Sequence, residues 1–511
     1  MLMSRYAAID IGSNSIRMLT AEVHPGEPMK VLAASRQVLR LGSSVFRAGR
    51  LSPEAIDASC AVLAAMADEY RRHEVIAVRA VGTAALRDAS NRAEFLERAS
   101  AVLGTPVEVI SGLEEARLIH LGVANAWPNA GHRIMITDIG GGSAEMIVSE
   151  GNRIVEAYSK PLGAVRLTEL FLKNDPPDPR EIQRMRRYIQ ERIAGAAARF
   201  ATSRIDRMIA TSATAAATVC AVNRVRRTKR DEADRRPATL PQIRRLLRDI
   251  STQDLAGRQH MVGIGPKRAE IIVAGVAVLQ EVMEQFRLPR LYYSSAGLRE
   301  GIVTDLAHRK VGHDVARLDP DQRRVVHSLG QRYGMSGPHV RKVAQLASML
   351  FAGMQPLHQL APAHGQLLEA AAYLYNIGHF VNEARHHRHS YYLVMNSDLP
   401  GFTEPERVII ANLCRYHRKS VPQLSHEGFE ALDLEARNTV LLLIPLLRLA
   451  VALDQSQEQR VERVETFVRP NAIEVEIHAQ RDTDIEQWHA LRIADTFREV
   501  YGSPLEVRTA K

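Results

Sequence analysis

Two stretches of the chain share one pattern of apolar and polar positions. In each, a short apolar run carries an aspartate at its end, glycines and small polar residues follow, and a second apolar run begins; the stretches are residues 6–20 and 134–148. Apolar runs of four to eight residues bounded by turn residues are typical of buried strands. The pattern therefore predicts two strand–turn–strand hairpins built on the same plan.

Helix signals lie between these two hairpins. Residues 21–48 are expected to form further strand and turn, and a Ser-Pro-Glu sequence then predicts a helix over residues 53–72, because serine is a good N-cap and proline suits the first helical turn. Ser111 and Glu114 fit a capping box, in which the serine hydroxyl meets the N3 amide and the N3 carboxylate returns to the N-cap amide. Glu114 thereby receives a structural role, whereas Glu115 does not.

The glycine-rich turns are suited to binding phosphate. Glycine has no Cβ, so the backbone of residues 140–142 can approach an anion closely and turn several N–H groups toward it. Asp138 and Glu145 flank this turn with carboxylates, the ligand type that Mg²⁺ prefers. Alone, the motif is equally compatible with an ordinary glycine-rich hairpin. The second copy in residues 6–20 favours a phosphate site.

Three side chains outside the turns are further candidates. Thr83 and Arg87 follow a short buried strand and could offer a hydroxyl and a guanidinium to a phosphate, although a surface ion pair is the alternative for Arg87. Glu115 stands at a helix start beside the two turns. It is the candidate to orient or deprotonate an attacking water.

The composition narrows the class of protein without naming a ligand. The 511 residues are 46% hydrophobic, enough for the cores of two to four domains. A net charge of +9 favours a polyanionic partner, with a merely well-solvated surface as the alternative. Because Cys60, Cys220 and Cys414 form no C-x-x-C pair, neither a disulfide framework nor a cysteine zinc site is expected.

Nothing in the sequence predicts export or a membrane span. The first strand begins by Tyr6, which leaves no room for a signal peptide, and the most apolar run, residues 440–453, is short and interrupted by Pro445 and Arg448. We expect a soluble cytoplasmic protein without a membrane partner.

Four motifs occur in a characteristic order and spacing: DIGSNS, GTAALRDA, ISGLEEARLIHLG and DIGGGSAE. They resemble motifs of the exopolyphosphatase and guanosine-pentaphosphate phosphohydrolase (Ppx/GppA) family. The resemblance implies an α/β fold of two actin-like, ribonuclease H-like lobes around a cleft, at residues 1–125 and 126–305. It also implies that water removes the terminal phosphate of polyphosphate or guanosine pentaphosphate with Mg²⁺ as cofactor; whether K⁺ assists is open.

The resemblance also implies roles for single residues. Glu115 matches the family's catalytic glutamate, and Asp138 and Glu145 match the acidic residues of its second phosphate loop. Our hypothesis adds Asp10 as a third Mg²⁺ ligand, held directly or through water, and Arg87 to steady the phosphate being removed. The phosphate-binding residues would be Gly12, Ser13, Asn14, Ser15, Thr83, Arg87, Gly140, Gly141, Gly142 and Ser143.

Some positions depart from the family pattern. Thr211 and Thr214 stand where the family carries two glycines, and Ser295-Ala296 stands where it carries Asp-Gly. We therefore assign no catalytic role to Ser295 or Ala296, and the departure weakens the case for phosphate contacts at Thr211 and Thr214.

From about Leu306 the pattern becomes helical and histidine-rich, which indicates a new all-α domain at residues 306–456. It resembles HD-type metal phosphohydrolases, but Tyr375-Asn376 replaces the metal-binding His-Asp pair, so no catalytic metal is predicted there. Residues 457–511 are predicted to form a small α+β domain. Other ligand positions of the HD pattern are matched by His389, His417 and Asp454.

Basic residues cluster in two places. For residues 223–248 a solvated, mobile loop is favoured over a dedicated polyanion site. On the helical domain, basic side chains could line a path continuous with the cleft that grips a long phosphate chain, or could instead form a homodimer surface. The path residues would be Arg388, His389, Arg415, His417, Arg418 and Lys419.

These observations predict an exopolyphosphatase that hydrolyses the terminal phosphate of inorganic polyphosphate. Guanosine-pentaphosphate hydrolysis is the alternative within the family, and a non-hydrolytic sensor of polyphosphate or guanosine tetraphosphate is an alternative of another class. An actin-like sugar or acetate kinase ranks lower, because the motifs match the phosphatase branch. No G-x-x-x-x-G-K-[ST] loop is present, so a P-loop NTPase is not supported, and no nucleic-acid partner is expected.

Overall fold

The computed structural model describes residues 4–24, 27–128, 131–200, 204–309, 317–419, 421–426, 428–430, 432–469 and 471–510. The chain divides into two compact units, which are residues 1–312 (unit 1) and 313–511 (unit 2). Each unit is described by itself. In the described part of the chain, no helix combines the length and the apolar character needed to cross a bilayer.

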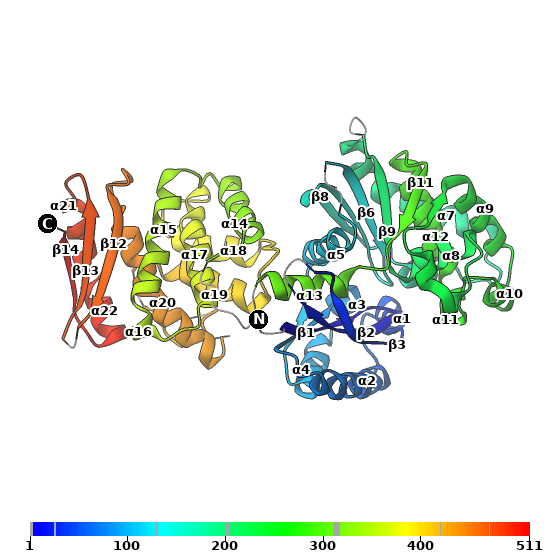
Figure 1. The fold of residues 1–511 in the computed structure, drawn as a ribbon, viewed down its shortest axis with the longest axis horizontal. Coiled ribbons are helices and arrows are strands. Elements are labelled where there is room, and N and C mark those ends of the chain that lie inside the picture. Colours follow the sequence, from blue (N-terminus) through cyan, green and yellow to red (C-terminus); the bar gives the residue numbers. More distant parts are fainter. Residues whose placement is uncertain are drawn as a thin grey trace. The chain divides into compact units, whose positions relative to one another are not determined.

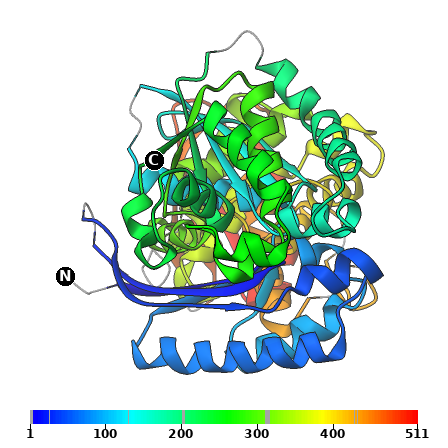
Figure 2. The ribbon, with the colours of Figure 1, turned by 90° about the vertical axis from the view of Figure 1, so that its right-hand side faces the viewer.

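The first sheet of unit 1 has the strand order β3-β2-β1-β4-β5. Strand β1 pairs antiparallel with β2 and parallel with β4. Helices α2 and α4 cover one face and bury Leu63 and Phe95 there, and Figure 2 shows the long helix α2 beneath the blue strands. The bounds are β1 Ser4–Ile11, β2 Ser15–Val23, β3 Lys30–Val38, β4 Ala77–Gly82, β5 Val107–Val109, α2 Pro53–Arg72 and α4 Arg92–Leu103.

The second sheet of unit 1 repeats the plan of the first. Its order is β10-β11-β9-β6-β7-β8, in which β6, β7 and β8 form an antiparallel meander and β9 and β11 continue in parallel (Figure 1). The two hairpins predicted from the sequence are therefore β1–β2 and β6–β7, at equivalent places in two related sheets. The bounds are β6 Arg133–Ile139, β7 Ala144–Glu150, β8 Arg153–Lys160, β9 Arg207–Thr211, β10 Pro237–Thr239 and β11 Arg290–Tyr293.

Two helices, α5 (Gly112–Ala126) and α13 (Leu298–His308), share one apolar core with both sheets. They pack closely, because a Cβ added to Gly301 would lie 1.7 Å from the carbonyl oxygen of Leu118. The N-terminus of α5, which carries Glu115, is thereby fixed between the two hairpins.

The other helices of unit 1 complete its core and its surface. Helices α7, α8, α9 and α12 contribute to the apolar core on the outer face of the second sheet. The bounds are α1 Leu41–Ala48, α3 Ala84–Asp88, α6 Ala164–Phe171, α7 Pro179–Arg199, α8 Ser212–Val222, η1 Arg227–Ala233, α9 Leu240–Ser251, α10 Leu255–His260, α11 Pro266–Ala269 and α12 Ile272–Gln285.

Unit 2 joins a helical bundle to a small three-stranded sheet. Its apolar core is continuous from Leu318 in the bundle to Leu505 in β14, the strand that pairs in parallel with β13. The bounds are α14 Pro320–Arg332, α15 Pro338–Gly353, α16 Gln355–His358, α17 Ala363–Leu374, η2 Ile377–Phe380, α18 His386–Met395, α19 Glu404–Tyr416, α20 Leu434–Ala452, β12 Val461–Val468, β13 Ile473–Ala479, α21 Asp484–Leu491, α22 Ala494–Tyr501 and β14 Leu505–Thr509.

The local predictions have mixed outcomes. The helix over residues 53–72 is confirmed, with the Ser52 hydroxyl accepting from Ala55 N–H. The expectation of strand and turn over residues 21–48 was partly wrong, because residues 41–48 form helix α1. The capping box at the start of α5 forms only by half: Ser111 Oγ accepts from Glu114 N–H at 3.2 Å, but the Glu114 carboxylate turns to two arginines instead of back to the N-cap.

Candidate active site

A cleft of about 70 Å³ opens where the two hairpin turns and the starts of helices α5, α8 and α13 meet in unit 1. Both lobes contribute to its wall, as the sequence predicted. Of the residues predicted to bind phosphate or metal or to act in catalysis, the wall includes Asp10, Gly12, Ser13, Asn14, Ser15, Thr83, Glu115, Asp138, Gly140, Gly141, Gly142 and Ser143.

The two turns press against each other. A Cβ added to Gly141 would lie 2.9 Å from Ser13 Cβ, and one added to Gly142 would lie 2.7 Å from Ser13 Oγ, so only glycine allows this approach. In the described residues, Ser13 Oγ and Asn14 Nδ2 are buried without a hydrogen-bond partner. Unpartnered polar groups in a buried wall are costly, and a ligand that accepts hydrogen bonds would satisfy them.

Glu115 enters the cleft from the first turn of α5 and is paired with an arginine. Arg87 Nη1 donates to Glu115 Oε2 at 2.9 Å and to the carbonyl oxygen of Ile110 at 2.8 Å. Burial raises the pKa of Glu115 to about 7, and repulsion from Asp10 and Asp138 adds to this rise. The attraction of Arg87 opposes it without cancelling it. A carboxyl group with this pKa can accept a proton near neutral pH.

Arg87 lies behind the wall and reaches Ser143 Oγ with Nη2 at 3.5 Å. The sequence left a surface ion pair as the alternative for Arg87. In the structure Arg87 forms a partly buried ion pair with Glu115 instead.

The other carboxylates of the cleft also have raised pKa values. Burial raises the pKa of Asp138 to about 6 against the attraction of Arg17, and burial raises that of Asp10 as well. Glu145 lies behind the wall and accepts from Ser159 Oγ at 2.8 Å. Burial, reinforced by Glu115 and Asp138, raises its pKa well above the usual range.

This excess of buried negative charge fits a divalent cation. Hard oxygen donors are what Mg²⁺ binds, and Mg²⁺ usually keeps several waters and takes only one or two carboxylates directly. Among the described residues, Asp10, Asp138 and Glu145 do not form a group whose ligand atoms all lie within 4.8 Å of one another. The donor set suits a hydrated ion shared with phosphate oxygens.

Several arginines in the wall were not predicted. Arg17, Arg268 and Arg299 reach the cleft from β2, α11 and α13. Arg268 is 8% exposed, and in the described residues no carboxylate lies within 4 Å of its guanidinium. Burial, with repulsion from Arg36 and Arg17, lowers its pKa to about 9. Alternation along β2 could have revealed Arg17, which lies two residues after Ser15 on the same face.

The basic stretch at residues 223–248 requires a correction. It was interpreted as a solvated loop, and most of its side chains are exposed, but residues 227–233 form a 3₁₀ helix. Arg230 turns inward, donates to Tyr293 Oη at 2.7 Å and lines the cleft. The sequence could not separate it from its neighbours, because tertiary packing selects the one arginine that faces in.

The positions that depart from the family pattern have internal partners. Thr211 Oγ1 donates to the carbonyl oxygen of Ala296 at 2.7 Å, and Thr214 Oγ1 donates to that of Ile139 at 3.0 Å. Ser295 lines the cleft, and its N–H donates to Asp234 Oδ1 at 2.7 Å. The Thr214 hydroxyl thus holds the backbone at the end of β6, and the Thr211 hydroxyl holds the loop before α13.

The predicted path in unit 2 is only partly assembled. His417, Arg418 and Lys419 line one cavity. The other three residues, Arg388, His389 and Arg415, are not in its wall, and Arg415 lies over the rings of Tyr391 and Tyr416 instead. The predicted path for a phosphate chain therefore stays a prediction.

Comparison with known proteins decides the family. The model of the Ppx/GppA phosphatase family matches residues 19–310, and that of Ppx/GppA phosphatase domain III matches residues 322–497. The chain belongs to the Ppx/GppA phosphatase family. This membership confirms the family inferred from the four motifs, the prediction of a phosphoanhydride hydrolase and the actin-like α/β fold.

Curated relatives align over almost the whole chain. A guanosine-5'-triphosphate,3'-diphosphate pyrophosphatase of Vibrio parahaemolyticus is 29% identical over 94% of this chain and 96% of its own. The enzyme of the same name from Photobacterium profundum is 30% identical over 88% of this chain and 86% of its own.

Solved structures match the first three-fifths of the chain. The Ppx/GppA family member of Aquifex aeolicus is 28% identical with a TM-score of 0.54, and the match covers 61% of this chain and 99% of that one. An exopolyphosphatase from Cytophaga hutchinsonii is 26% identical with a TM-score of 0.55, over 59% of this chain and 97% of that one.

Proposed function

We propose that this Ppx/GppA family member hydrolyses the terminal phosphoanhydride bond of guanosine pentaphosphate and of inorganic polyphosphate, with Mg²⁺ as cofactor. The observation that carries the proposal is the position of Glu115: a buried carboxyl group with a pKa of about 7 lines the same small cleft as two glycine-rich turns. That combination places a proton acceptor, the Glu115 carboxylate, beside a site for anions.

The residues of the chain divide the work as follows. Amides and hydroxyls of the two turns, Gly12–Ser15 and Gly140–Ser143, hold the terminal phosphates, and Thr83 adds a hydroxyl. Glu115 accepts the proton of the attacking water, while Arg87 fixes the carboxylate through its 2.9 Å contact and extends toward Ser143. Arginines in the wall counter the charge on the leaving phosphates.

A bound Mg²⁺, held by Asp10, Asp138 and Glu145 directly or through water, would draw charge from the phosphate oxygens.

A side cavity favours guanosine pentaphosphate as one substrate. It has about 240 Å³ and adjoins the cleft, because Ala213, Arg230 and Arg268 line both. Its wall combines apolar residues such as Val38 and Ala216 with further cations, including Arg36. The apolar residues could contact the guanine ring, and the cations could contact the 3'-diphosphate. Such a nucleotide is also the substrate class in the names of the curated relatives.

Inorganic polyphosphate is the second substrate. The cations around the cleft can contact phosphates whether or not the ligand carries a guanine ring. In addition, the relative from Cytophaga hutchinsonii is named an exopolyphosphatase.

The domain limits 1–125, 126–305, 306–456 and 457–511, the HD-like character of the helical domain and the cytoplasmic location stay part of this proposal.

The deciding experiment measures phosphate release with Mg²⁺ from guanosine pentaphosphate and from long-chain polyphosphate, for the wild type and Glu115→Gln. We expect release from both substrates by the wild type and loss of both in the variant. Tight binding without release by the wild type would replace the proposal with a phosphate sensor. Transfer of phosphate from ATP to a small acceptor would indicate a kinase.

A further inference from the structure

The second phosphate turn, residues 140–143, rests on the first turn of helix α6. The backbone N–H groups of residues 164–166 donate to the carbonyl oxygens of Gly140 and Gly141 at 2.9 to 3.1 Å. The approach is so close that a Cβ added to Gly163, the N-cap of α6, would lie 2.3 Å from the carbonyl carbon of Gly141. The backbone of α6 therefore fixes the first two carbonyl groups of the turn.

The third carbonyl group of the turn is held by a side chain. Arg166 Nε donates to the carbonyl oxygen of Gly142 at 2.8 Å. Gly142 and Ser143 line the cleft, whereas Arg166 is not among the described residues of its wall. Because the C=O and N–H of a trans peptide point in opposite directions, the N–H of Ser143 is turned away from Arg166. An N–H on that side can donate to a phosphate, which a carbonyl oxygen would repel.

Two neighbours from the first lobe hold the Arg166 side chain in place. Its guanidinium lies over the Phe46 ring of α1, 3.9 Å from the ring centre, and its Nη2 donates to Asp88 Oδ2 at 2.5 Å. Phe46 also packs against the turn, since a Cβ added to Gly142 would lie 2.6 Å from Phe46 Cζ. Contacts with its face and its edge orient the planar guanidinium.

Asp88 connects Arg166 to the partner of Glu115. It is the last residue of α3 and directly follows Arg87, which donates to Glu115 Oε2 at 2.9 Å. Arg166 thereby bridges the phosphate turn of one lobe and, in the other lobe, the short helix that orients the proton acceptor.

We propose that Arg166 is a positioning residue for phosphate hydrolysis: it holds the Gly142 carbonyl behind the wall and so keeps the Ser143 N–H aimed at the phosphate being removed. Preorganised N–H donors are most effective where charge develops in the transition state. Arg166 acts through the turn and is not a further cation of the wall. This inference deepens the proposed function and rests on it.

The test measures phosphate release with Mg²⁺ from guanosine pentaphosphate and from inorganic polyphosphate, for the full wild-type chain and Arg166→Ala. Without its donor the Gly142 carbonyl can turn, so kcat should fall by about 10- to 100-fold, somewhat less than when a whole oxyanion donor is deleted. KM should change by less than about 3-fold, because the cations of the wall are untouched.

Arg47→Ala is the matched control. Arg47 of α1 also forms an ion pair with α6, but its Nη2 lies 3.2 Å from Glu169 Oε2 instead of binding the turn. Both substitutions remove one positive charge and one ion pair between α6 and the first lobe. The pair of Arg47 is exposed and contributes little, so kcat of the control should stay within about 3-fold of the wild type.

Two further readouts separate positioning from a general loss of structure. Arg166→Lys keeps one donor for the Gly142 carbonyl and should retain more kcat than Arg166→Ala. Added guanidinium ion, at concentrations too low to unfold either variant, should raise kcat of Arg166→Ala and leave that of Arg47→Ala unchanged. Should Arg166→Ala fail to fold, Arg166→Met keeps the apolar stem on Phe46 without the donor and carries the same expectations.

Three results would overturn the proposal: a kcat of Arg166→Ala within about 3-fold of the wild type, an equal loss of kcat in Arg47→Ala, or a rise in KM at unchanged kcat. Failure of the proposed function has a different readout, because the wild type itself would then release no phosphate.

Discussion

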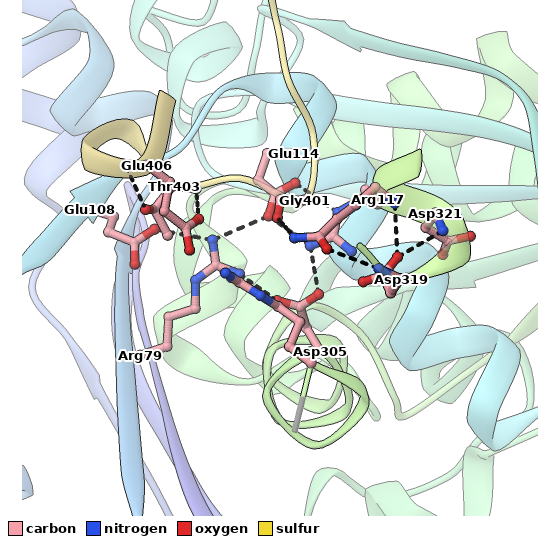
Figure 3. Close-up of polar contacts among 12 residues, drawn as sticks. Arg79, Glu108, Glu114, Arg117, Asp305, Asp319, Asp321, Gly401, Thr403 and Glu406 are labelled. Carbon is pink, nitrogen blue, oxygen red and sulfur yellow. Dashed lines mark hydrogen bonds and ion pairs between the residues drawn. The ribbon is translucent and has the colours of Figure 1, made fainter. Parts of the chain in front are cut away.

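Glu114 and Glu115 are consecutive residues of α5, and both are buried, yet their carboxylates have opposite surroundings. Glu114 contacts Arg79 at 3.2 Å and Arg117 at 2.8 Å, and both arginines also bind Asp305 of α13 (Figure 3). Glu115 meets only Arg87 at salt-bridge distance in the described residues, on a wall that it shares with other carboxylates.

The pKa values show what this difference means. Burial alone raises the pKa of a carboxyl group, but Arg117 and Arg79 outweigh it and lower the pKa of Asp305 to about 2 and that of Glu114 below its usual value. In the cleft, burial prevails and the pKa of Glu115 rises to about 7. In the first network carboxylates and arginines offset one another, whereas the carboxylates of the cleft are only partly compensated by its cations.

The largest expected effect is a fall in kcat when Glu115 is replaced. Glu115→Gln keeps the shape of the side chain but removes the base, so kcat should fall by about 10²- to 10⁴-fold. Stability should stay equal or rise, because an unfavourable buried charge is lost. Phosphate release and urea unfolding would be measured on the same preparation. A kcat within threefold of the wild type would remove Glu115 from its role.

The next prediction concerns the ion pairs that Asp305 makes with Arg79 and Arg117. Asp305→Asn removes one of the carboxylates that Arg79 and Arg117 share, so Glu114 is left between two buried guanidinium groups and the free energy of unfolding should drop by about 3–5 kcal/mol, while kcat of the folded fraction stays near the wild type. As a control, exchanging Arg117 and Asp305 together for apolar residues should cost less than Asp305→Asn alone. A loss of kcat without a loss of stability would break the contrast.

The pH dependence of stability should have opposite signs in the two regions. For Glu115, whose pKa is raised to about 7, the stabilisation is present below about pH 4.5 and is lost as the pH rises through 7. For Asp305, whose pKa is lowered to about 2, the contribution is present above about pH 4 and is lost as the pH falls toward 2.

Urea unfolding without Mg²⁺, over this pH range, would test these signs. Relative to Glu115→Gln, the wild type should lose about 3 kcal/mol between pH 4.5 and 7.5. A difference that is constant with pH would show that Glu115 is compensated after all.

The smallest expected effect concerns Arg268, a cleft arginine with no carboxylate within 4 Å in the described residues. Arg268→Ala should raise KM by about 10-fold, because one charge-assisted contact to the substrate is lost, and should leave the unfolding free energy unchanged or higher. Arg226→Ala is the control, because Arg226 is exposed and lines neither cavity of unit 1. Steady-state kinetics would check both. An equal rise of KM in the control would point to a general effect of charge.

Much of unit 1 could be predicted because its signals are local. An apolar run that leads into an aspartate and glycines specifies a strand and its turn without any knowledge of the rest of the chain, and two such turns were placed correctly at the ends of β1 and β6. Glu115 was singled out by a spacing argument about Ser111 and Glu114. The structure places Glu115 in the wall of the cleft, although the return bond of Glu114 to the N-cap does not form.

The arginines that line the cleft could not be predicted in the same way. Arg230 comes from a basic stretch in which most arginines are exposed, and Arg268 from a mixed stretch, and nothing local marks either as a residue of the cleft. In unit 2, His417, Arg418 and Lys419 of the predicted path line a cavity, but Arg415, only two residues before His417, lies outside its wall.

The sequence by itself determined the two phosphate turns, the helix that carries Glu115 and the membership of the family, because backbone conformation and motif spacing depend on neighbours in the chain. Only the tertiary structure decided which charges are compensated. Glu114 and Glu115 are chemically identical neighbours, and their pKa values diverge because Arg117 of α5 and Arg79 of β4 contact one of them, while the cleft brings other carboxylates to the other.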